Sequence, residues 1–284
     1  MNERVQVEVK DGIADVRLCR PEKRNALDQP MFHGLIKAGR ELSADPSVRV
    51  AVLHGEGPAF CGGLDFMSFA EMLSGNLSAD SDQVQRAVEE KTEGGASWFQ
   101  LPAWIWYEAP FPVIAAVQGA AYGAGLHIAL GADMRVVAPD AKLAFVEVNW
   151  GLVPDMSASQ ALHRLVPLDV AKRMAMTGLP INGEEAARYG LATEVSETPY
   201  ERARELAEII AKKSPDAIRS IKRLLNQSAL VPLAEGLAME FEFSGALMGT
   251  PNQMEAIGAS FEKREPVFQD SKTWFYPRTG SSSP

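Results

Sequence analysis

Two glycine-rich segments, each directly after a short apolar run, constrain the fold of this chain more than any other feature. Residues 59–65 read AFCGGLD and residues 119–125 read GAAYGAG. The apolar runs before them, at 48–53 and 112–117, are typical of buried strands, and a helical pattern follows each segment. One such turn predicts only close packing of the backbone. Two of them at neighbouring strand ends could direct two N–H groups at one oxygen atom, as in an oxyanion hole.

The remaining patterns predict strands and helices in the first half of the chain and helices in most of the second half. Alternating residues at 5–18, with Asp11-Gly12 between them, predict a β-hairpin. Asp28 is expected to cap a helix that runs to about Leu42. We expect an α/β core over 1–200 and a helical region with a terminal tail over 201–284. Further strands are predicted at 133–138 and 142–145, and helices at 125–130, 156–164, 168–176, 183–189, 200–212, 214–228, 232–248 and 251–263.

Composition narrows the classes of function. The chain has 284 residues and a net charge of −9, which argues against a nucleic-acid partner because phosphate binding needs a basic surface. Cys19 and Cys61 are its only cysteines, so a disulfide framework is not expected. The charged N-terminus lacks the apolar stretch of a secretory signal, and no apolar run reaches membrane-spanning length. We therefore expect a cytoplasmic protein without a membrane partner.

Four ordered segments, together with a C-terminal one, resemble the crotonase superfamily, also called the enoyl-CoA hydratase/isomerase superfamily. The resemblance implies a crotonase-like spiral of ββα units whose C-terminal helical region mediates oligomerisation, as a homotrimer or a dimer of trimers. It also implies an acyl-CoA thioester substrate and no cofactor beyond the coenzyme A moiety of that substrate. The segments are RPEKRNAL at 20–27, 59–65, 113–125, FVEVNWGLVPD at 145–155, and FEKREPVF at 261–268.

The resemblance also assigns binding roles to particular positions. The backbone N–H groups of Leu64 and Ala124 would hold the thioester oxygen, whatever their side chains are. The segment 23–27 resembles the coenzyme A loop, in which two cations suit the phosphates of the cofactor moiety. A solvated polar loop would be the simpler interpretation of that segment if it stood alone. The expected coenzyme A contacts are Lys23, Arg24, Ala26, Leu27, Asp65 and Lys263.

The acid–base positions distinguish the reactions of the superfamily. Its hydratases carry two glutamates, and this chain has Glu147 at the second position and His127 at the first. A neutral imidazole can donate and accept hydrogen bonds, so His127 could orient water or substrate, or it could be a structural residue with satisfied hydrogen bonds. No metal site is expected, because no cluster of histidines and carboxylates has ligand spacing.

Asp155 favours one branch of the superfamily. Its spacing from Glu147 resembles that of the dienoyl-CoA isomerases, where two carboxylates move a proton between distant carbons. Asp155 is also expected to cap the helix at 156–164. The aromatic cluster at 98–106 is expected to be core, and it could also shape an acyl pocket. We therefore favour a double-bond isomerase, with a 2-enoyl-CoA hydratase as the alternative and a non-catalytic acyl-CoA binder or an RNA-binding relative as a further one.

Overall fold

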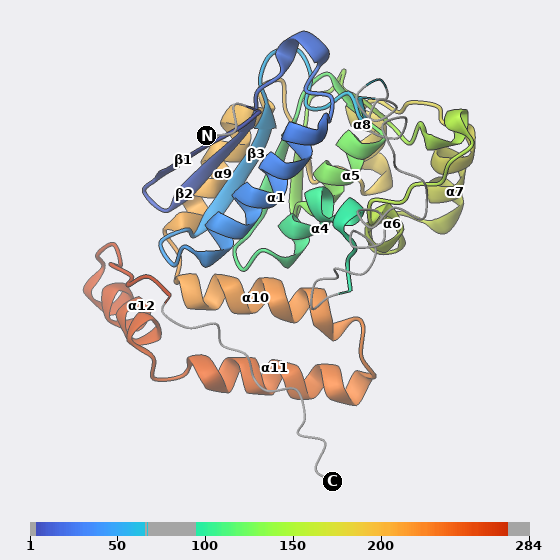
Figure 1. Ribbon diagram of the computed structural model, residues 1–284. Coiled ribbons are helices and arrows are strands. Elements are labelled where there is room, and N and C mark those ends of the chain that lie inside the picture. The colour runs from blue at the N-terminus through green and yellow to red at the C-terminus, as the bar shows by residue number, and fades with distance from the viewer. Residues whose placement is uncertain (1–3, 66, 68–94, 272–284) are drawn as a thin grey trace.

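The computed structural model describes residues 4–65, 67 and 95–271 (Figure 1). Most of the interrupted helical pattern predicted from Phe66 onward, including most of the polar stretch 78–97, lies outside the described residues. So does the C-terminal tail at 280–284.

A six-stranded sheet organises the core. Its strand order is β1-β2-β3-β4-β6-β8, and every neighbouring pair is parallel except the N-terminal hairpin. That hairpin confirms the prediction for 5–18. The strands are β1 (Val5–Lys10), β2 (Ile13–Leu18), β3 (Val50–Gly55), β4 (Val113–Val117), β6 (Met134–Val137) and β8 (Glu194–Val195).

A second, two-stranded parallel sheet consists of β5 (Ala120–Tyr122) and β7 (Lys142–Ala144). Only β7 was predicted. β5 lies inside the second glycine-rich segment, which we expected to be a turn throughout. Three residues flanked by glycines carry too little periodicity to indicate a strand.

Helices cover both faces of the main sheet (Figure 1). On one face lies α1 (Gln29–Ala44), and Asp28 caps it as predicted by accepting a 2.9 Å hydrogen bond from the Met31 N–H. The same face carries α4 (Leu101–Glu108) and α5 (Ala124–Gly131). On the other face, α9 (Pro199–Ala211) buries three alanines against β3, β4 and β6. The second glycine-rich segment leads into α5 and therefore meets the face that carries α1, α4 and α5.

Short helices follow β7. They are η3 (Glu147–Trp150), α6 (Ala158–Leu165), α7 (Leu168–Thr177) and α8 (Gly183–Tyr189), and two further 3-10 turns are η1 (Pro21–Lys23) and η2 (Trp98–Gln100). The expected cap at Asp155 is wrong. Ser157, with a φ of 68°, precedes α6, and no side chain caps that helix. The left-handed residue turns the chain into the helix two residues later than the sequence pattern indicated.

The C-terminal helices α10 (Pro215–Ser228), α11 (Leu233–Leu247) and α12 (Pro251–Glu262) extend below the core in Figure 1. Buried Lys222 joins α10 to the core: its Nζ lies 2.8 Å from Asp133 and donates to the carbonyls of Trp106 and Phe111. No helix in the described ranges is long and apolar enough to cross a membrane.

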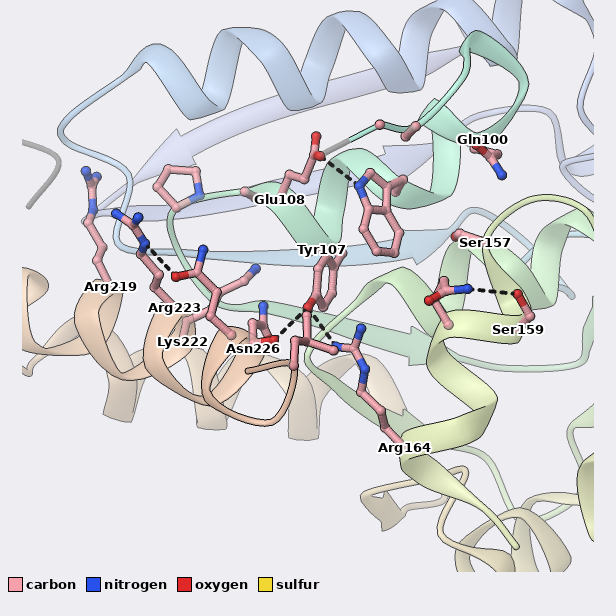
Figure 2. Close-up of a pocket in the computed structure, with 18 of the residues that line it drawn as sticks. Gln100, Tyr107, Glu108, Ser157, Ser159, Arg164, Arg219, Lys222, Arg223 and Asn226 are labelled. Carbon is pink, nitrogen blue, oxygen red and sulfur yellow. Dashed lines mark hydrogen bonds between the residues drawn. The ribbon is translucent and has the colours of Figure 1, made fainter. Parts of the chain in front are cut away.

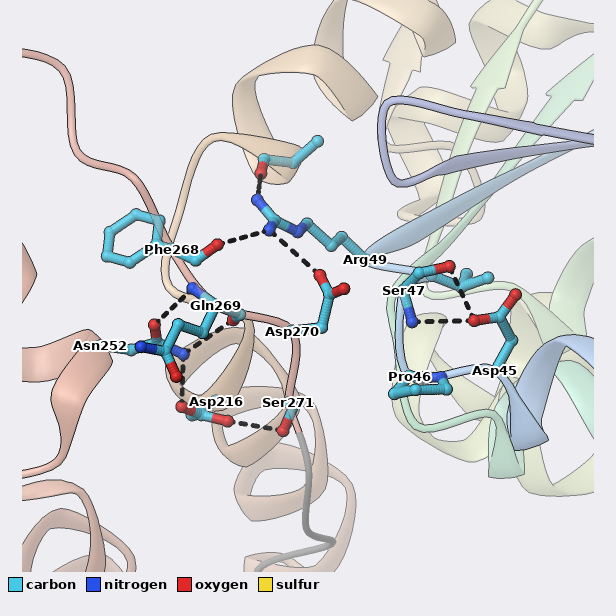
Figure 3. A network of polar contacts seen from close by, with 12 residues as sticks. Asp45, Pro46, Ser47, Arg49, Asp216, Asn252, Phe268, Gln269, Asp270 and Ser271 are labelled. Carbon is cyan, nitrogen blue, oxygen red and sulfur yellow. Dashed lines mark hydrogen bonds and ion pairs between the residues drawn. The ribbon is translucent and has the colours of Figure 1, made fainter.

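A polar network fixes the last described residues (Figure 3). Arg49 donates to the carbonyl of Phe268 and pairs with Asp270, while Asn252 bridges Asp216 and Gln269. Ser271 also donates to Asp216 at 2.5 Å. The chain end is thereby anchored to α10, α12 and the residue before β3.

Candidate active site

The first glycine-rich segment is held beside the loop at 20–27. The Leu27 N–H donates to the Gly63 carbonyl at 2.8 Å, and the Asp65 N–H donates to the Leu27 carbonyl at 2.9 Å. Leu64 lies between these two bonded groups, and its own N–H donates to no protein acceptor in the described part of the chain. This N–H is therefore a donor available to a ligand.

The second segment starts α5. Gly123 has a φ of 47°, a conformation that favours glycine, and Ala124 is the first helical residue. A first-turn N–H has no partner within its helix, and among the described groups none accepts from the Ala124 N–H. A Cβ added to Gly63 would come within 2.7 Å of the Tyr122 carbonyl and 4.0 Å of the Ala124 nitrogen. The two predicted donors therefore lie on adjoining backbone segments.

Glu147 lies against the second segment. A Cβ added to Gly123 would approach Glu147 Oε1 to 3.1 Å, so this glycine leaves room for the carboxylate beside Ala124. Glu147 is the first residue of η3, two residues after the buried Phe145. Its Oε2 is buried and has no hydrogen-bond partner among the described residues. A buried carboxylate oxygen without a partner is costly in a purely structural role.

His127 is buried on α5 and faces Glu147. Its Nδ1 accepts a 3.2 Å hydrogen bond from the Met156 N–H, so the neutral ring carries its proton on Nε2. Nε2 lies 3.1 Å from Glu147 Oε1, but the N–H does not point at this oxygen closely enough to form a hydrogen bond. The contact with Met156 fits the structural interpretation of His127, and the position of Nε2 beside the carboxylate fits the functional one.

Asp155 is exposed, and no contact between its side chain and Glu147 occurs among the described residues. It is nevertheless one residue from Met156, whose N–H binds His127. Asp155 also lines a cleft. Asp155 and Glu147 are therefore connected only through Met156 and His127, and their carboxylates do not contact each other.

The loop at 20–27 is ordered by side chains that the sequence did not single out. Buried Asn25 donates to the Ala59 and Phe60 carbonyls at 2.8 and 3.2 Å and accepts from the Arg20 N–H. Buried Arg20 lies 2.8 Å from Asp65, which ties the loop to the first glycine-rich segment. Asp65 is therefore part of the scaffold of this loop. An asparagine within this hydrophilic loop is the only trace of this role in the sequence. Its burial, and with it the role, becomes visible only in the fold.

The predicted coenzyme A side chains are arranged as follows. Lys23 and Arg24 are exposed, and Arg24 has a φ of 50° at the end of η1. Lys263 is exposed at the left-handed end of α12, remote in sequence from both glycine-rich segments. Its neighbour Arg264 is held by Glu255 and Glu262. Lys23 and Arg24 therefore lie on the loop beside Leu64, whereas no contact of Lys263 with that loop occurs in the described residues.

Cysteine chemistry is unsuited to this site. Burial raises the pKa of the Cys61 thiol to about 12, and the thiol donates to the Asn25 carbonyl. A thiol with such a pKa supplies almost no thiolate near neutral pH. In the part of the chain that the structure describes, no three histidine, cysteine or acidic side chains group into a metal site.

Comparisons with known proteins agree with this geometry. The model of the enoyl-CoA hydratase/isomerase family matches residues 8–271. The chain belongs to the enoyl-CoA hydratase/isomerase family. It is 32% identical to (E)-benzylidenesuccinyl-CoA hydratase of Thauera aromatica over 271 residues, covering 93% of this chain and 98% of that protein. It is also 32% identical to 2,3-dehydroadipyl-CoA hydratase of Escherichia coli K12, covering 89% and 93%.

Solved structures of family members share the fold. An enoyl-CoA hydratase structure from Bacillus anthracis has a TM-score of 0.84 and 29% identity, covering 94% of this chain and all of that one. The crotonase resemblance, the α/β fold with C-terminal helices, and the assignment to the enoyl-CoA hydratase/isomerase enzymes are thereby confirmed. The dienoyl-CoA isomerase branch is not specifically indicated, because most of the named relatives are hydratases.

Proposed function

We propose that this enzyme hydrates the double bond of a 2-enoyl-CoA thioester. One observation carries the proposal. The Glu147 carboxylate lies beside Gly123 and has a buried Oε2 without a partner, and the nearby backbone N–H groups of Leu64 and Ala124 are also without acceptors among the described groups. This combination provides a base and two oxyanion donors in one place. The hydratases among the similar proteins favour water addition over our initial expectation of an isomerase.

In the proposed reaction, the thioester oxygen accepts hydrogen bonds from the Leu64 and Ala124 N–H groups. Glu147 Oε2 takes a proton from water as the water oxygen bonds to the β-carbon. The electron pair of the double bond moves to the thioester oxygen and forms an enolate. Protonated Glu147 then returns the proton to the α-carbon, which yields a 3-hydroxyacyl thioester. A single carboxylate suffices because the proton it takes is the proton it gives back.

His127 has a supporting role in this proposal. Its Nε2 lies 3.1 Å from Glu147 Oε1, and Oε2, which has no partner among the described residues, is the oxygen proposed to exchange the proton with water. The second glutamate of the family's hydratases would instead bring a second negative charge. We infer that this enzyme replaces a two-carboxylate arrangement with one carboxylate and one oriented donor.

Coenzyme A is proposed to bind along 23–27, with Lys23 and Arg24 near the phosphates and the backbone at Ala26 and Leu27 near the adenine. The order imposed on this loop by Asn25, and its contact with the first glycine-rich segment, support the assignment. Lys263 is proposed to reach the coenzyme A bound to a neighbouring subunit. Exposed apolar side chains on the C-terminal helices support a homotrimer or a dimer of trimers: Leu233, Leu237, Phe241, Met254, Ile257 and Phe261.

Double-bond isomerisation is the second candidate, and the position of Asp155 on the wall of an adjoining cleft favours it. A carboxylate there could exchange a proton farther along the acyl chain than Glu147. The two reactions are separated by incubating the purified protein with crotonyl-CoA and with a 3,5-dienoyl-CoA. Hydration of crotonyl-CoA without dienoyl isomerisation is expected. Isomerisation without hydration would overturn the proposal, and tight binding of both thioesters without turnover would favour a non-catalytic binder.

A further inference from the structure

A cleft of about 1230 Å³ lies between α4, α6 and α10 (Figure 2). It adjoins the proposed reacting centre through one segment of chain. Asp155 lines the cleft, and the N–H of the next residue, Met156, donates to His127, which lies beside Glu147. An acyl chain that passes this segment would enter the cleft. A role of the cleft in substrate binding therefore depends on the proposed function.

Tyr107, Arg164 and Asn226 meet in the middle of the cleft and come from three different helices (Figure 2). Arg164 Nη1 donates to the Tyr107 hydroxyl at 2.7 Å, and its guanidinium lies 4.9 Å from the centre of the tyrosine ring. The same hydroxyl donates to the Asn226 carbonyl at 3.2 Å. The tyrosine thereby fixes the guanidinium in direction while it uses only one of the five N–H donors of arginine.

Other charged groups in the cleft are already engaged within the protein. Lys222 pairs with Asp133, and Asp216 accepts from Asn252 and Ser271. Arg219 donates to the carbonyls of Pro46 and Val48. Arg223 donates to Gln227, and Glu108 accepts from the Trp104 ring N–H. Arg164 is bonded to a tyrosine hydroxyl and, like Arg219, has no carboxylate within ion-pair distance among the described residues. It is an oriented guanidinium whose charge is not matched by an acidic side chain.

Asp155 and Arg164 lie at opposite ends of α6. Asp155 precedes the helix, and Arg164 is its second-to-last residue, about 9 Å along the axis from Ala158. An anionic group in the cleft would be repelled from the Asp155 end and attracted to the Arg164 end. A planar guanidinium suits a carboxylate because it can present two parallel N–H donors.

We propose that the cleft binds acyl-CoA substrates whose acyl group ends in a second carboxylate, and that Arg164 recognises this carboxylate. Tyr107 and Asn226 position the guanidinium. The class of substrate is thus the CoA thioester of an unsaturated dicarboxylic acid. The Arg164 side chain is exposed, so the preference is expected to be about tenfold rather than several orders of magnitude.

The test measures binding of unreactive, saturated thioesters by calorimetry, in pairs of equal length. Adipyl-CoA is compared with hexanoyl-CoA, and suberyl-CoA with octanoyl-CoA. We expect at least one dicarboxylic thioester to bind about tenfold more tightly than its partner. The ratio of the two dissociation constants should fall toward one in Arg164→Gln. Arg164→Lys should retain only part of the preference, because lysine lacks the two parallel N–H donors of the guanidinium.

Arg173→Gln is the matched control. Arg173 also donates to a tyrosine hydroxyl, that of Tyr189 at 3.0 Å, but it lies on α7 outside the cleft. It should leave the ratio unchanged. No preference for either dicarboxylic thioester in the wild type, or a preference that survives Arg164→Gln, would overturn the proposal. Crotonyl-CoA turnover is measured in parallel, so a failure of the proposed hydratase activity is distinguished from a failure of carboxylate recognition.

Discussion

The proposed reacting centre and the cleft beside it are built in different ways. At the reacting centre the polar groups are backbone N–H groups and one carboxylate, set by glycines that allow chain segments to approach each other. In the cleft the polar groups belong to long side chains from α4, α6 and α10. At the centre, donors and an acceptor have no protein partners among the described groups, whereas polar groups of the cleft are engaged by other protein groups.

This difference suggests a division of labour. Groups fixed by the backbone can stabilise a developing charge without rearranging, which is the requirement of catalysis. Side chains on separate helices can be exchanged without disturbing the fold, which suits substrate selection. Changes at the centre should therefore lower kcat for every substrate, and changes in the cleft should alter the ratio between substrates.

The largest effect is expected from Ala124→Pro. Proline lacks the N–H and is tolerated at the first position of a helix, so the oxyanion donor is lost while α5 can still form. We expect kcat for crotonyl-CoA to fall about 10²- to 10³-fold. Leu168→Pro, at the exposed first position of α7, is the control and should retain activity. Steady-state kinetics with circular dichroism checks both variants, and equal activity in the two would refute a donor role for residue 124.

His127 should have an intermediate effect. Leucine in its place removes both the acceptor of the Met156 N–H and the donor beside Glu147, whereas glutamine can supply both. We expect His127→Leu to lower kcat about tenfold and the free energy of unfolding by about 1–3 kcal/mol, because a buried N–H loses its partner. His127→Gln should recover most of both. If glutamine were no better than leucine, the hydrogen-bonding role of His127 would be wrong.

Much of the architecture could be predicted because it is encoded locally. The hairpin of β1 and β2, the Asp28 cap and the helices from α7 to α12 follow from alternation, capping residues and periodicity. β5 and β8 could not be predicted, since strands of two or three residues depend on their neighbours in the sheet.

The residues of the candidate site also differ in how far they could be predicted from local sequence. Leu64, Ala124, Glu147 and His127 were found from ordered motifs, and the structure gathers them. The pairing of Tyr107 with Arg164 joins residues 57 positions apart on different helices. No local pattern indicates such a contact, because it is created by the packing of α4 against its neighbours. Roles that depend on long side chains from separate helices are therefore the part that sequence reasoning missed.

The smallest effect is expected outside both regions, at Asp15. Burial would raise the pKa of Asp15, but hydrogen bonds from His54 and Tyr200 outweigh it and hold the pKa below its ordinary value. Because the folded pKa is the lower one, this stabilisation is complete above about pH 4 and is lost as the pH falls through the folded pKa.

Asp15→Asn should therefore lower the free energy of unfolding by about 1 kcal/mol near neutral pH and by less in acid. Substrate preference should be unchanged, because Asp15 lies on β2 beneath α9 and is absent from the cleft. Denaturant unfolding between about pH 3 and pH 7 measures the difference. If Asp15→Asn lowered the free energy of unfolding by the same amount across this pH range, the lowered pKa of Asp15 would not contribute to stability, contrary to this prediction.

The central claim is that two backbone N–H groups and Glu147 together form an enolate of a CoA thioester. Exchange of the α-protons of butyryl-CoA in D₂O tests it directly, because this saturated thioester can neither be hydrated nor isomerised. Mass spectrometry should detect deuterium at the α-carbon with the wild-type enzyme, at a rate reduced about 10²- to 10⁴-fold in Glu147→Gln. Bound butyryl-CoA that does not exchange, or exchange that is unaffected in Glu147→Gln, would contradict the account.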